Sequence, residues 1–516
     1  MTDNDPRACL CVDLGTGGPK IGLVSLTGHV LAKELHSVTT NYGPRGEATQ
    51  DPNEWWRIIK EACQRLLHQG VVRRSDVVAV AITGQWSSTV PVDANGTPTG
   101  DCIMWMDSRG SKHTRNFIGG PAMGYQPLRV LQWIRHTGGA PSLSGADPIG
   151  HRLYLENEEP DLVARTRWFL EPVDFLTMQF TGSANASHAS MQGAWLTDTR
   201  HLSTYDYDQS LIRPLGIDGD KLAPLRPIGS ILGYVQTSLA SELGLNADVA
   251  VITGLPDLQA ATLGVGATSM YQTHLALSTT SWISCPVPKK KTDIAHSIAT
   301  VPGLTNDSYL LVNNQETGAK SLDWVRSVLL GGTTFSYDDL CAMAEKAPAG
   351  SNGVVFTPWL AGERSPVDMH SARAGFSNLQ LATSPNDLIR SVMEGVAYNS
   401  RWLLYYVERF TQRPLTPIRL VGGGAQSPLW CQIYADVLNR TVEQIPDPMF
   451  AQMRGMAVLA GVALKERSLN EIGDVLPEAR SFHPNPDVVG RYDQLASQVP
   501  TIFKDSKQHW RSLRSF

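Results

Sequence analysis

The stretch VAVITGLPDLQAATLGVG, residues 249–266, is the part of the chain that decides the fold. It opens with an apolar run at 249–252, which predicts a buried strand. Residues 253–256 end that strand, and the apolar, small residues at 258–263 predict a helix. Asp257 stands between the two, where α/β enzymes place catalytic or binding groups. Alternatively, Asp257 caps the helix, so its role depends on the rest of the chain.

The composition is that of a globular protein with more than one domain. The chain has 516 residues, of which 42% are hydrophobic and 18% are charged. This balance is typical of a globular protein, and the length exceeds what one core accommodates. We therefore expect two large domains.

Several classes of protein are excluded by charge and patterning. The net charge of −5 argues against a nucleic-acid-binding protein, and the run Lys289-Lys290-Lys291 is more typical of a solvated turn. No segment reaches the ~18 apolar residues of a membrane span, and the polar N-terminus is not a secretory signal. The seven cysteines have no metal-ligand spacing. We therefore expect reduced thiols in a cytoplasmic protein.

Residues 8–24, ACLCVDLGTGGPKIGLV, predict a β-hairpin with a glycine-rich turn. Around Gly15 the backbone N–H groups can approach phosphate oxygens, while Thr16 adds a hydroxyl and Lys20 a positive charge. The Asp13 carboxylate is a suitable ligand for Mg²⁺. The GxxxxGK[ST] spacing of a Walker A loop is missing, and an ordinary hairpin is the alternative.

Polar residues follow the next buried strand, predicted at 76–82. Gln85, Trp86 and Ser87 offer an amide, an indole face and a hydroxyl to a ligand, unless they form an ordinary polar loop. Further on, Asp107 and Arg109 either pair with each other or line a sugar site. These five residues are our candidate substrate-binding positions, together with Asp257.

The second half of the chain contains a hairpin pattern similar to that of the first half. Residues 273–285, THLALSTTSWISC, predict a hairpin whose turn contains Thr279 and Thr280. Gly318 precedes a predicted helix. A strand at 418–421 leads into the glycines 422–424 and a helix that begins near Ser427. The turn through Gly423, Gly424 and Ala425 leaves a flat slot in which an adenine ring could lie.

Taken together and in order, these motifs resemble the FGGY carbohydrate kinases, and within them the xylulokinase group. The resemblance covers roughly residues 8 to 465. Its motifs are Asp13-Leu14-Gly15-Thr16 with Lys20, Thr83-Gly84-Gln85, Trp105-x-Asp107-x-Arg109, Gly254-x-x-Asp257, Thr279-Thr280, Gly318, Gly375-Phe376 with Asp387-Leu388, and Gly422-Gly423-Gly424-Ala425 with Ser427.

The resemblance implies an α/β fold with two actin-like (ribonuclease H-like) domains and a cleft between them. Residues 1–266 would form the sugar-binding domain and residues 267–516 the nucleotide-binding domain. It further implies that Asp257 takes the proton from the sugar hydroxyl, and that Mg²⁺ is held at Asp13 and Asp257. ATP would contact the two hairpin turns, Gly318 and the turn that ends at Ser427.

The sequence departs from the xylulokinase pattern mainly where the sugar is contacted. Trp86-Ser87 replaces the usual Met-His, Leu258 replaces Asn, Ser278 replaces Gly, and Val130 stands where Lys is frequent. We therefore expect ATP-dependent phosphorylation of a small-molecule sugar or polyol, first a ketopentose such as D-xylulose, with gluconate, glycerol or another polyol as alternatives. A non-catalytic ATP- or sugar-binding protein of the same fold is the alternative from another class. A homodimer is compatible with either.

Overall fold

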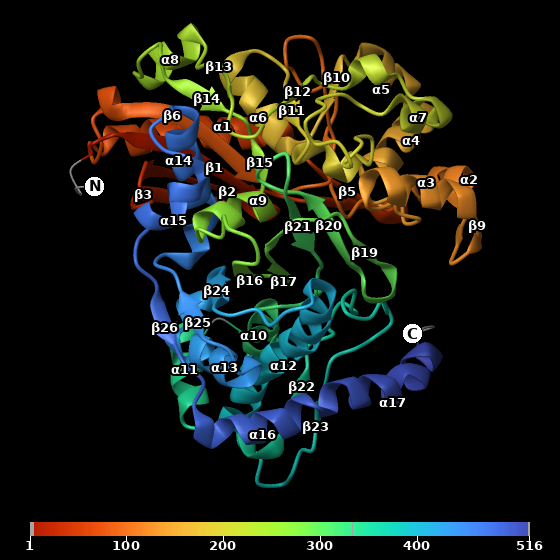
Figure 1. Ribbon diagram of the computed structural model, residues 1–516, viewed down its shortest axis with the longest axis vertical. Helices are drawn as coiled ribbons and strands as arrows, with labels where there is room; N and C mark the ends of the chain where they lie inside the picture. Colours follow the sequence, from red (N-terminus) through yellow and green to blue (C-terminus); the bar gives the residue numbers. More distant parts are fainter. Residues whose placement is uncertain (1–4, 333, 514–516) are drawn as a thin grey trace.

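The computed structural model describes residues 5–332 and 334–513, which form two α/β parts (Figure 1). The first half of the chain builds the upper part in that view, and most of the second half builds the lower part. The exception is the blue segment with α14 (Ala451–Ala463) and α15 (Ile472–Val475), which returns to the upper part.

The first part is built on a seven-stranded sheet. Its inner strands are apolar and buried because helices cover both faces. In spatial order they are β13 (Ile231–Tyr234), β14 (Ala250–Ile252), β6 (Val77–Gly84), β1 (Ala8–Gly15), β2 (Gly18–Ser25) and β3 (Val30–Leu35), with β15 (Leu255–Pro256) also paired with β6.

Alternate residues of β1 face opposite sides of this sheet. Leu10 and Val12 belong to the core formed with α1 (Pro52–His68) and α6 (Pro172–Thr181). Cys9 and Cys11 belong to the core that includes α14. A helix from the last quarter of the chain therefore completes the first sheet.

The second part repeats this sheet with the same strand directions. Its order is β17 (Ser281–Ser284), β16 (Thr273–Leu277), β24 (Ile418–Val421), β25 (Val442–Gln444) and β26 (Arg480–Phe482). In both sheets a hairpin is followed by two parallel neighbours and an antiparallel edge strand. The predicted pair of similar hairpins, one in each half, is confirmed.

Helices with strong start signals surround the second sheet. The expected long helix is α12 (Pro385–Thr411), whose N-terminus carries a capping box between Ser384 and Asp387. It packs against α13 (Pro428–Leu438), and α16 (Pro486–Ala496) and α17 (Gln498–Ser512) follow at the end of the described chain. Of the helices within residues 5–332 and 334–513, none combines the length and apolarity that crossing a membrane requires.

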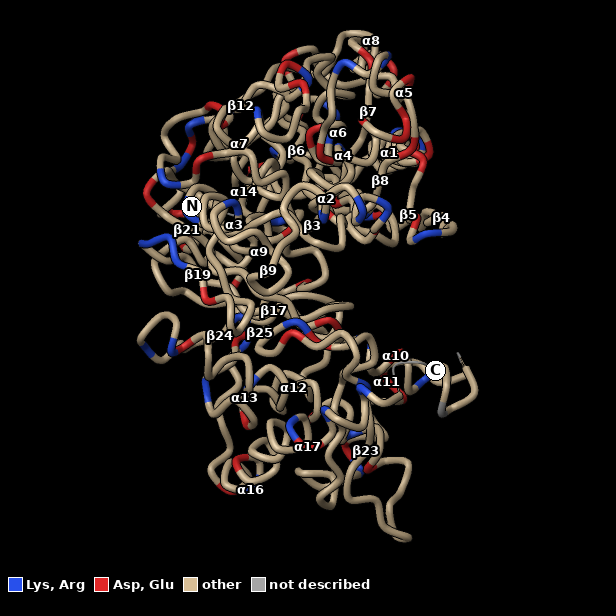
Figure 2. Tube along the Cα trace, turned by 90° about the vertical axis from the view of Figure 1, so that its right-hand side faces the viewer, with Lys and Arg blue, Asp and Glu red and all other residues tan. Residues whose placement is uncertain are grey.

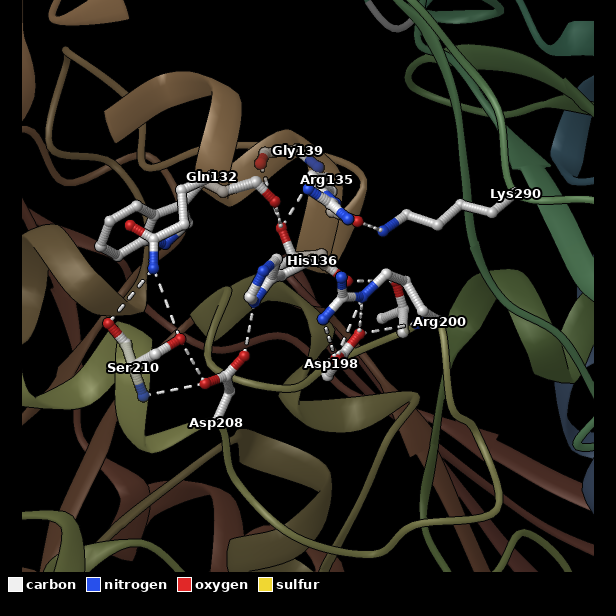
Figure 3. Close-up of polar contacts among 12 residues, drawn as sticks. Gln132, Arg135, His136, Gly139, Asp198, Arg200, Asp208, Ser210 and Lys290 are labelled. Carbon is white, nitrogen blue, oxygen red and sulfur yellow. Dashed lines mark hydrogen bonds and ion pairs between the residues drawn. The ribbon is translucent and has the colours of Figure 1, made fainter. Parts of the chain in front are cut away.

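A small four-stranded sheet of the second half contacts the first half. Its order is β18 (Pro286–Val287), β21 (Tyr309–Val312), β20 (Ile298–Pro302) and β19 (Thr292–Asp293). Between β18 and β19, Lys290 Nζ donates to the Arg135 carbonyl at 2.6 Å, at the end of α3 (Pro127–Thr137) (Figure 3). Lys291 Nζ donates to the Phe410 carbonyl at 2.8 Å. Lys289 and Lys291 are exposed at this bend, as expected of a solvated turn, and Lys290 and Lys291 in addition hold backbone carbonyls at the ends of α3 and α12.

Charged residues of both signs are interspersed along both parts of the chain (Figure 2). This mixture accompanies the small net charge of −5. It is typical of a surface without a strong field of one sign.

Candidate functional site

Two acidic residues meet at one edge of the first sheet. Strands β1 and β15 both pair in parallel with β6, so that Thr83 lies opposite Asp13 in one pairing and opposite Leu255 in the other. Asp257 follows two residues after Leu255, as the first residue of α9 (Asp257–Gly264). The sheet therefore places both carboxylates at the carboxyl end of β6.

Asp257 is held in a form suited to proton transfer near neutral pH. Its side chain is half-buried, and burial raises its pKa to about 6, with the charge of Asp13 adding to the increase. The Leu258 amide and Lys20 act in the opposite direction. The N-cap position belongs to Pro256, so the alternative that Asp257 is only a helix cap does not describe this structure.

Lys20 lies directly opposite Asp13 in the first hairpin. Its Nζ is 2.7 Å from Asp13 Oδ2, and the Asp13 side chain is almost fully buried. The turn between them needs Gly18, which has φ +136° and whose added Cβ would lie 2.1 Å from the His36 carbonyl. The predicted glycine-rich hairpin is confirmed, with its acid and its cation paired.

The turn at Gly15 and Thr16 is tied to the loops around it. Trp105 Nε1 donates to Thr16 Oγ1 at 3.1 Å, and Gln50 Nε2 donates to the Thr16 carbonyl at 2.8 Å. The backbone N–H of Gln85 donates to the Leu14 carbonyl at 2.8 Å. Gln85 Nε2 is buried and has no partner among the described residues, which leaves a donor beside the turn.

Trp86 and Ser87 are fixed by contacts that sequence reasoning did not foresee. Trp86 Nε1 donates to the Ser190 carbonyl at 2.9 Å, and the indole packs against the apolar cluster of Leu258, Val301 and Leu310. This cluster joins α9 of the first part to β20 and β21 of the second. Ser87 adopts a φ of +63°, a left-handed conformation that is unusual outside glycine.

The loop that contains Trp86 and Ser87 is also held by Glu171, a residue to which the sequence analysis assigned no role. Its Oε2 accepts from the Ser88 amide at 3.1 Å, and burial raises its pKa well above the usual value. A cavity of ≈ 20 Å³ beside it is lined by Ser88, Glu171 and Arg152 among others. The sequence did contain a signal for this role, namely an acid next to the apolar residues Phe169 and Leu170. A carboxyl group that is buried with its apolar neighbours needs a hydrogen-bond partner.

Asp107 and Arg109 pair with each other. Arg109 Nη2 is 2.8 Å from Asp107 Oδ2, and Arg109 Nη1 is 3.0 Å from Glu47 Oε1. Asp107 is fully buried and also accepts from the Ala48 amide at 2.9 Å. The pairing alternative describes this structure, and contact with a sugar stays a prediction for both residues.

In the second part, Gly318 packs directly on the hairpin turn. Its amide donates to the Thr279 carbonyl at 2.8 Å. An added Cβ at Gly318 would lie 2.5 Å from the Thr280 carbonyl and 2.8 Å from that of Ser278. Thr279 itself is exposed, so its hydroxyl is accessible to a ligand.

The glycine-rich turn after β24 lies next to this hairpin turn, because β24 pairs in parallel with β16. Gly422 has φ +95°, and its added Cβ would lie 2.3 Å from Ser278 Oγ. Gly424 packs on the Leu277 side chain, while Gly423 is exposed, with open space where a Cβ would stand.

The end of this turn follows the sequence prediction. Ala425 is fully buried. The Ser427 side chain accepts from the Trp430 amide at 3.2 Å and caps α13, which begins at Pro428. Ser427 therefore has a structural role here, and contact with a nucleotide stays a prediction for it.

One further group of possible metal ligands lies apart from these turns. His136, Asp198 and Asp208 each bring one ligand atom within 4.8 Å of the others (Figure 3). His136 Nδ1 is 2.6 Å from Asp208 Oδ2, and Arg200 Nη2 is 2.6 Å from Asp198 Oδ2. Both carboxylates therefore already have side-chain partners, and we assign no metal there.

Comparison with known proteins identifies the family. The N-terminal and C-terminal domains of the FGGY family of carbohydrate kinases match residues 8–264 and 261–464. The xylulose kinase of Staphylococcus epidermidis is 26% identical over 503 residues, 97% of each chain. The gluconokinase of Bacillus subtilis is 23% identical over 495 residues, which are 94% of this chain and 93% of that one.

The fold agrees with a solved structure of similar size. The gluconate kinase of Lactobacillus acidophilus superimposes with a TM-score of 0.84 at 22% identity, over 98% of this chain and 99% of that one. The prediction of an actin-like architecture is confirmed. The chain belongs to the FGGY family of carbohydrate kinases, and its two α/β parts have the actin-like, ribonuclease H-like fold of that family.

Proposed function

We propose that this carbohydrate kinase transfers the γ-phosphoryl group of ATP to a hydroxyl of a small sugar or polyol, and that a ketopentose such as D-xylulose is the first acceptor to test. The observation that carries the proposal is the position of Asp257 beside Asp13, at the carboxyl end of β6. A carboxylate there is suited to act on a substrate hydroxyl.

In the proposed reaction, Asp257 takes the proton of the acceptor hydroxyl as its oxygen attacks the γ-phosphorus. A new P–O bond forms to the sugar, and the bond between the γ-phosphorus and the bridging oxygen breaks, releasing ADP. Phosphoryl transfer asks for alignment and charge stabilisation more than for covalent chemistry. A carboxyl group with a pKa near 6 is largely ionised at neutral pH and is ready to accept the proton.

Groups on both hairpins would bind the phosphates and balance their negative charge. Asp13 and Asp257 offer the oxygen ligands that Mg²⁺ prefers, and Lys20 occupies only Oδ2 of Asp13. When bound, Mg²⁺ would neutralise phosphate charge. Thr16 and Thr279 supply hydroxyls at the two turns, and Thr280 lies beside Thr279.

The nucleoside would lie along the second part. Gly318 packs on the hairpin turn, and Gly423 is exposed with open space above its Cα. Gly424 and Ala425 form the floor of this turn. A flat backbone surface of this kind is suited to the face of a purine ring.

The acceptor is the finer part of the proposal. Relatives named xylulose kinase and gluconokinase have similar identity, so both acceptors belong in a test. Trp86 and Leu258 pack into one apolar cluster at positions where xylulokinases carry polar or smaller groups. Because missing hydrogen bonds change sugar discrimination strongly, we keep gluconate, glycerol and other polyols as alternatives.

The test is ADP release from Mg-ATP with a panel of ketoses, polyols and aldonates. One acceptor should give saturable turnover, and Asp257→Asn should lower kcat by roughly 10²–10⁴-fold because it removes the base. Asp248→Asn, an exposed acid that precedes β14 in the chain, is the control and should keep full activity. Turnover by Asp257→Asn within tenfold of the unaltered enzyme would remove Asp257 from its proposed role.

A further inference from the structure

The two hairpin turns differ in charge. The first carries Lys20, whereas the second, Ser278-Thr279-Thr280, offers only hydroxyls and backbone amides. Phosphoryl transfer spreads negative charge over the phosphate oxygens, and cations close to them stabilise it. A cation contributed by another segment would balance the second turn.

Arg364 belongs to the loop that follows β22 (Val355–Thr357). Its Nη2 lies 2.8 Å from Glu316 Oε1, and its side chain is 46% exposed. Glu316 follows Gln315, which exchanges two backbone hydrogen bonds with Ser281, at 3.1 and 2.7 Å. The guanidinium group therefore pairs with the neighbour of Gln315, which is bonded to Ser281, the first residue after the second hairpin turn.

The backbone around Arg364 is fixed by a buried acid. Glu363 is 1% exposed, and its Oε1 accepts from the amides of Glu316 at 3.1 Å and Arg364 at 2.9 Å. Its Oε2 accepts from Asn399 Nδ2 at 2.6 Å, on α12. Glu363 thus joins the loop, the segment that follows β21, and α12, while the Arg364 side chain remains outside this buried group.

The contact between Arg364 and Glu316 is an ion pair without hydrogen-bond alignment. Glu316 Oε1 is buried and accepts no hydrogen bond among the described residues, although Nη2 is near. The exposed guanidinium group therefore keeps its N–H groups for another acceptor. Since exposed ion pairs add little to stability and Glu363 already fixes the loop, holding the fold does not explain this arginine.

We propose that Arg364 binds the terminal phosphate oxygens of the nucleotide at the second hairpin turn, and that Glu316 keeps the guanidinium group there before the nucleotide arrives. This inference rests on the proposed use of ATP. Arginine is suited to the task because its planar fork binds two phosphate oxygens at once. Glu316 competes with phosphate for the same cation, so it lowers affinity while it improves placement.

The experiment is calorimetric titration of ATP, ADP and AMP without sugar, which separates nucleotide binding from acceptor chemistry. Arg364→Gln should weaken ATP and ADP binding by about tenfold, since it removes a charge-assisted contact to phosphate, and should leave AMP binding unchanged. Arg364→Lys should recover part of the loss. Glu316→Gln should tighten ATP binding, because the competing carboxylate is gone.

Arg401→Ala is the control, because Arg401 forms a half-exposed ion pair with Asp493 at 2.7 Å, between α12 and α16. It should bind all three nucleotides like the unaltered chain. Equal ATP affinity in Arg364→Gln, or an equal loss for AMP, would overturn the proposed phosphate contact. Failure of the unaltered chain to bind ATP would instead overturn the proposed function, and this inference with it.

Discussion

At the scale of single residues, Asp257 is the position where local and distant effects combine. Its place at the start of α9 follows from the strand and helix on either side of it. Its pKa of about 6 depends on burial, on Asp13 from β1 and on Lys20 from β2. Burial is the largest cause of the increase, and the first hairpin modifies it, because Asp13 raises the pKa of Asp257 and Lys20 lowers it.

We predict an acid limb in kcat/KM for the sugar at about pH 6. Below this pH Asp257 is protonated and cannot accept a proton, so kcat/KM should fall about tenfold per pH unit. Lys20→Met should move the limb to higher pH, because the cation that lowers the pKa of Asp257 is lost. Measuring kcat/KM from pH 4.5 to 8.5 checks both statements. A limb near pH 4, or one that Lys20→Met leaves in place, would contradict them.

At the scale of elements, the second hairpin depends on close contact with the segment that follows β21. Gly318 sits on the turn between β16 and β17 so closely that a methyl group would meet two carbonyl oxygens, at 2.5 and 2.8 Å. Both obstacles are backbone atoms, which cannot rotate away. A side chain at this position therefore moves the turn that carries Thr279 and Thr280.

We predict that Gly318→Ala lowers kcat/KM for ATP by roughly 10–100-fold, because small displacements of phosphate-binding groups are costly. The KM for the sugar should change much less. Gly490→Ala on α16 is the control, since its added methyl group meets open space, and it should leave both constants unaltered. Steady-state kinetics with each substrate varied in turn is the measurement. An unchanged KM for ATP in Gly318→Ala would separate Gly318 from the nucleotide site.

At the scale of the whole molecule, two helices from distant parts of the chain, α9 and α14, cross within the first part. An added Cβ at Gly455 would lie 2.0 Å from the Ala260 carbonyl, and one at Gly264 would lie 1.8 Å from the Ala451 carbonyl. The glycines thus allow two helix backbones to touch. Asp257 is the first residue of α9, so the proposed base and this crossing share one helix.

We predict that Gly455→Ala lowers the free energy of unfolding by about 1–3 kcal/mol, the usual cost of overpacking a core. Gly461→Ala, in the same helix, is the matched control, because its added methyl group meets only the end of the flexible Arg467 side chain, at 3.2 Å. It should be neutral or stabilising, as alanine favours helix over glycine. Urea unfolding followed by tryptophan fluorescence compares the two. Equal stability of both variants would show that the helices have room to separate.

The sequence by itself determined the parts of the site that depend on neighbours along the chain. The first hairpin with Asp13 opposite Lys20, the start of α9 at Asp257 and the cap at Ser427 follow from strand periodicity, turn glycines and capping residues. These features are local, so a few consecutive residues are enough to fix them.

The tertiary structure alone decided the rest. Three contacts join residues about 50 to more than 150 positions apart in the chain. They are Glu171 with Ser88, Lys290 with Arg135, and Arg364 with Glu316. The packing of α14 on the first sheet is of the same kind. The physical reason is that such contacts form only when distant segments exclude water together, and the free energy of burial, charge and hydrogen bonding then depends on partners that local sequence does not specify.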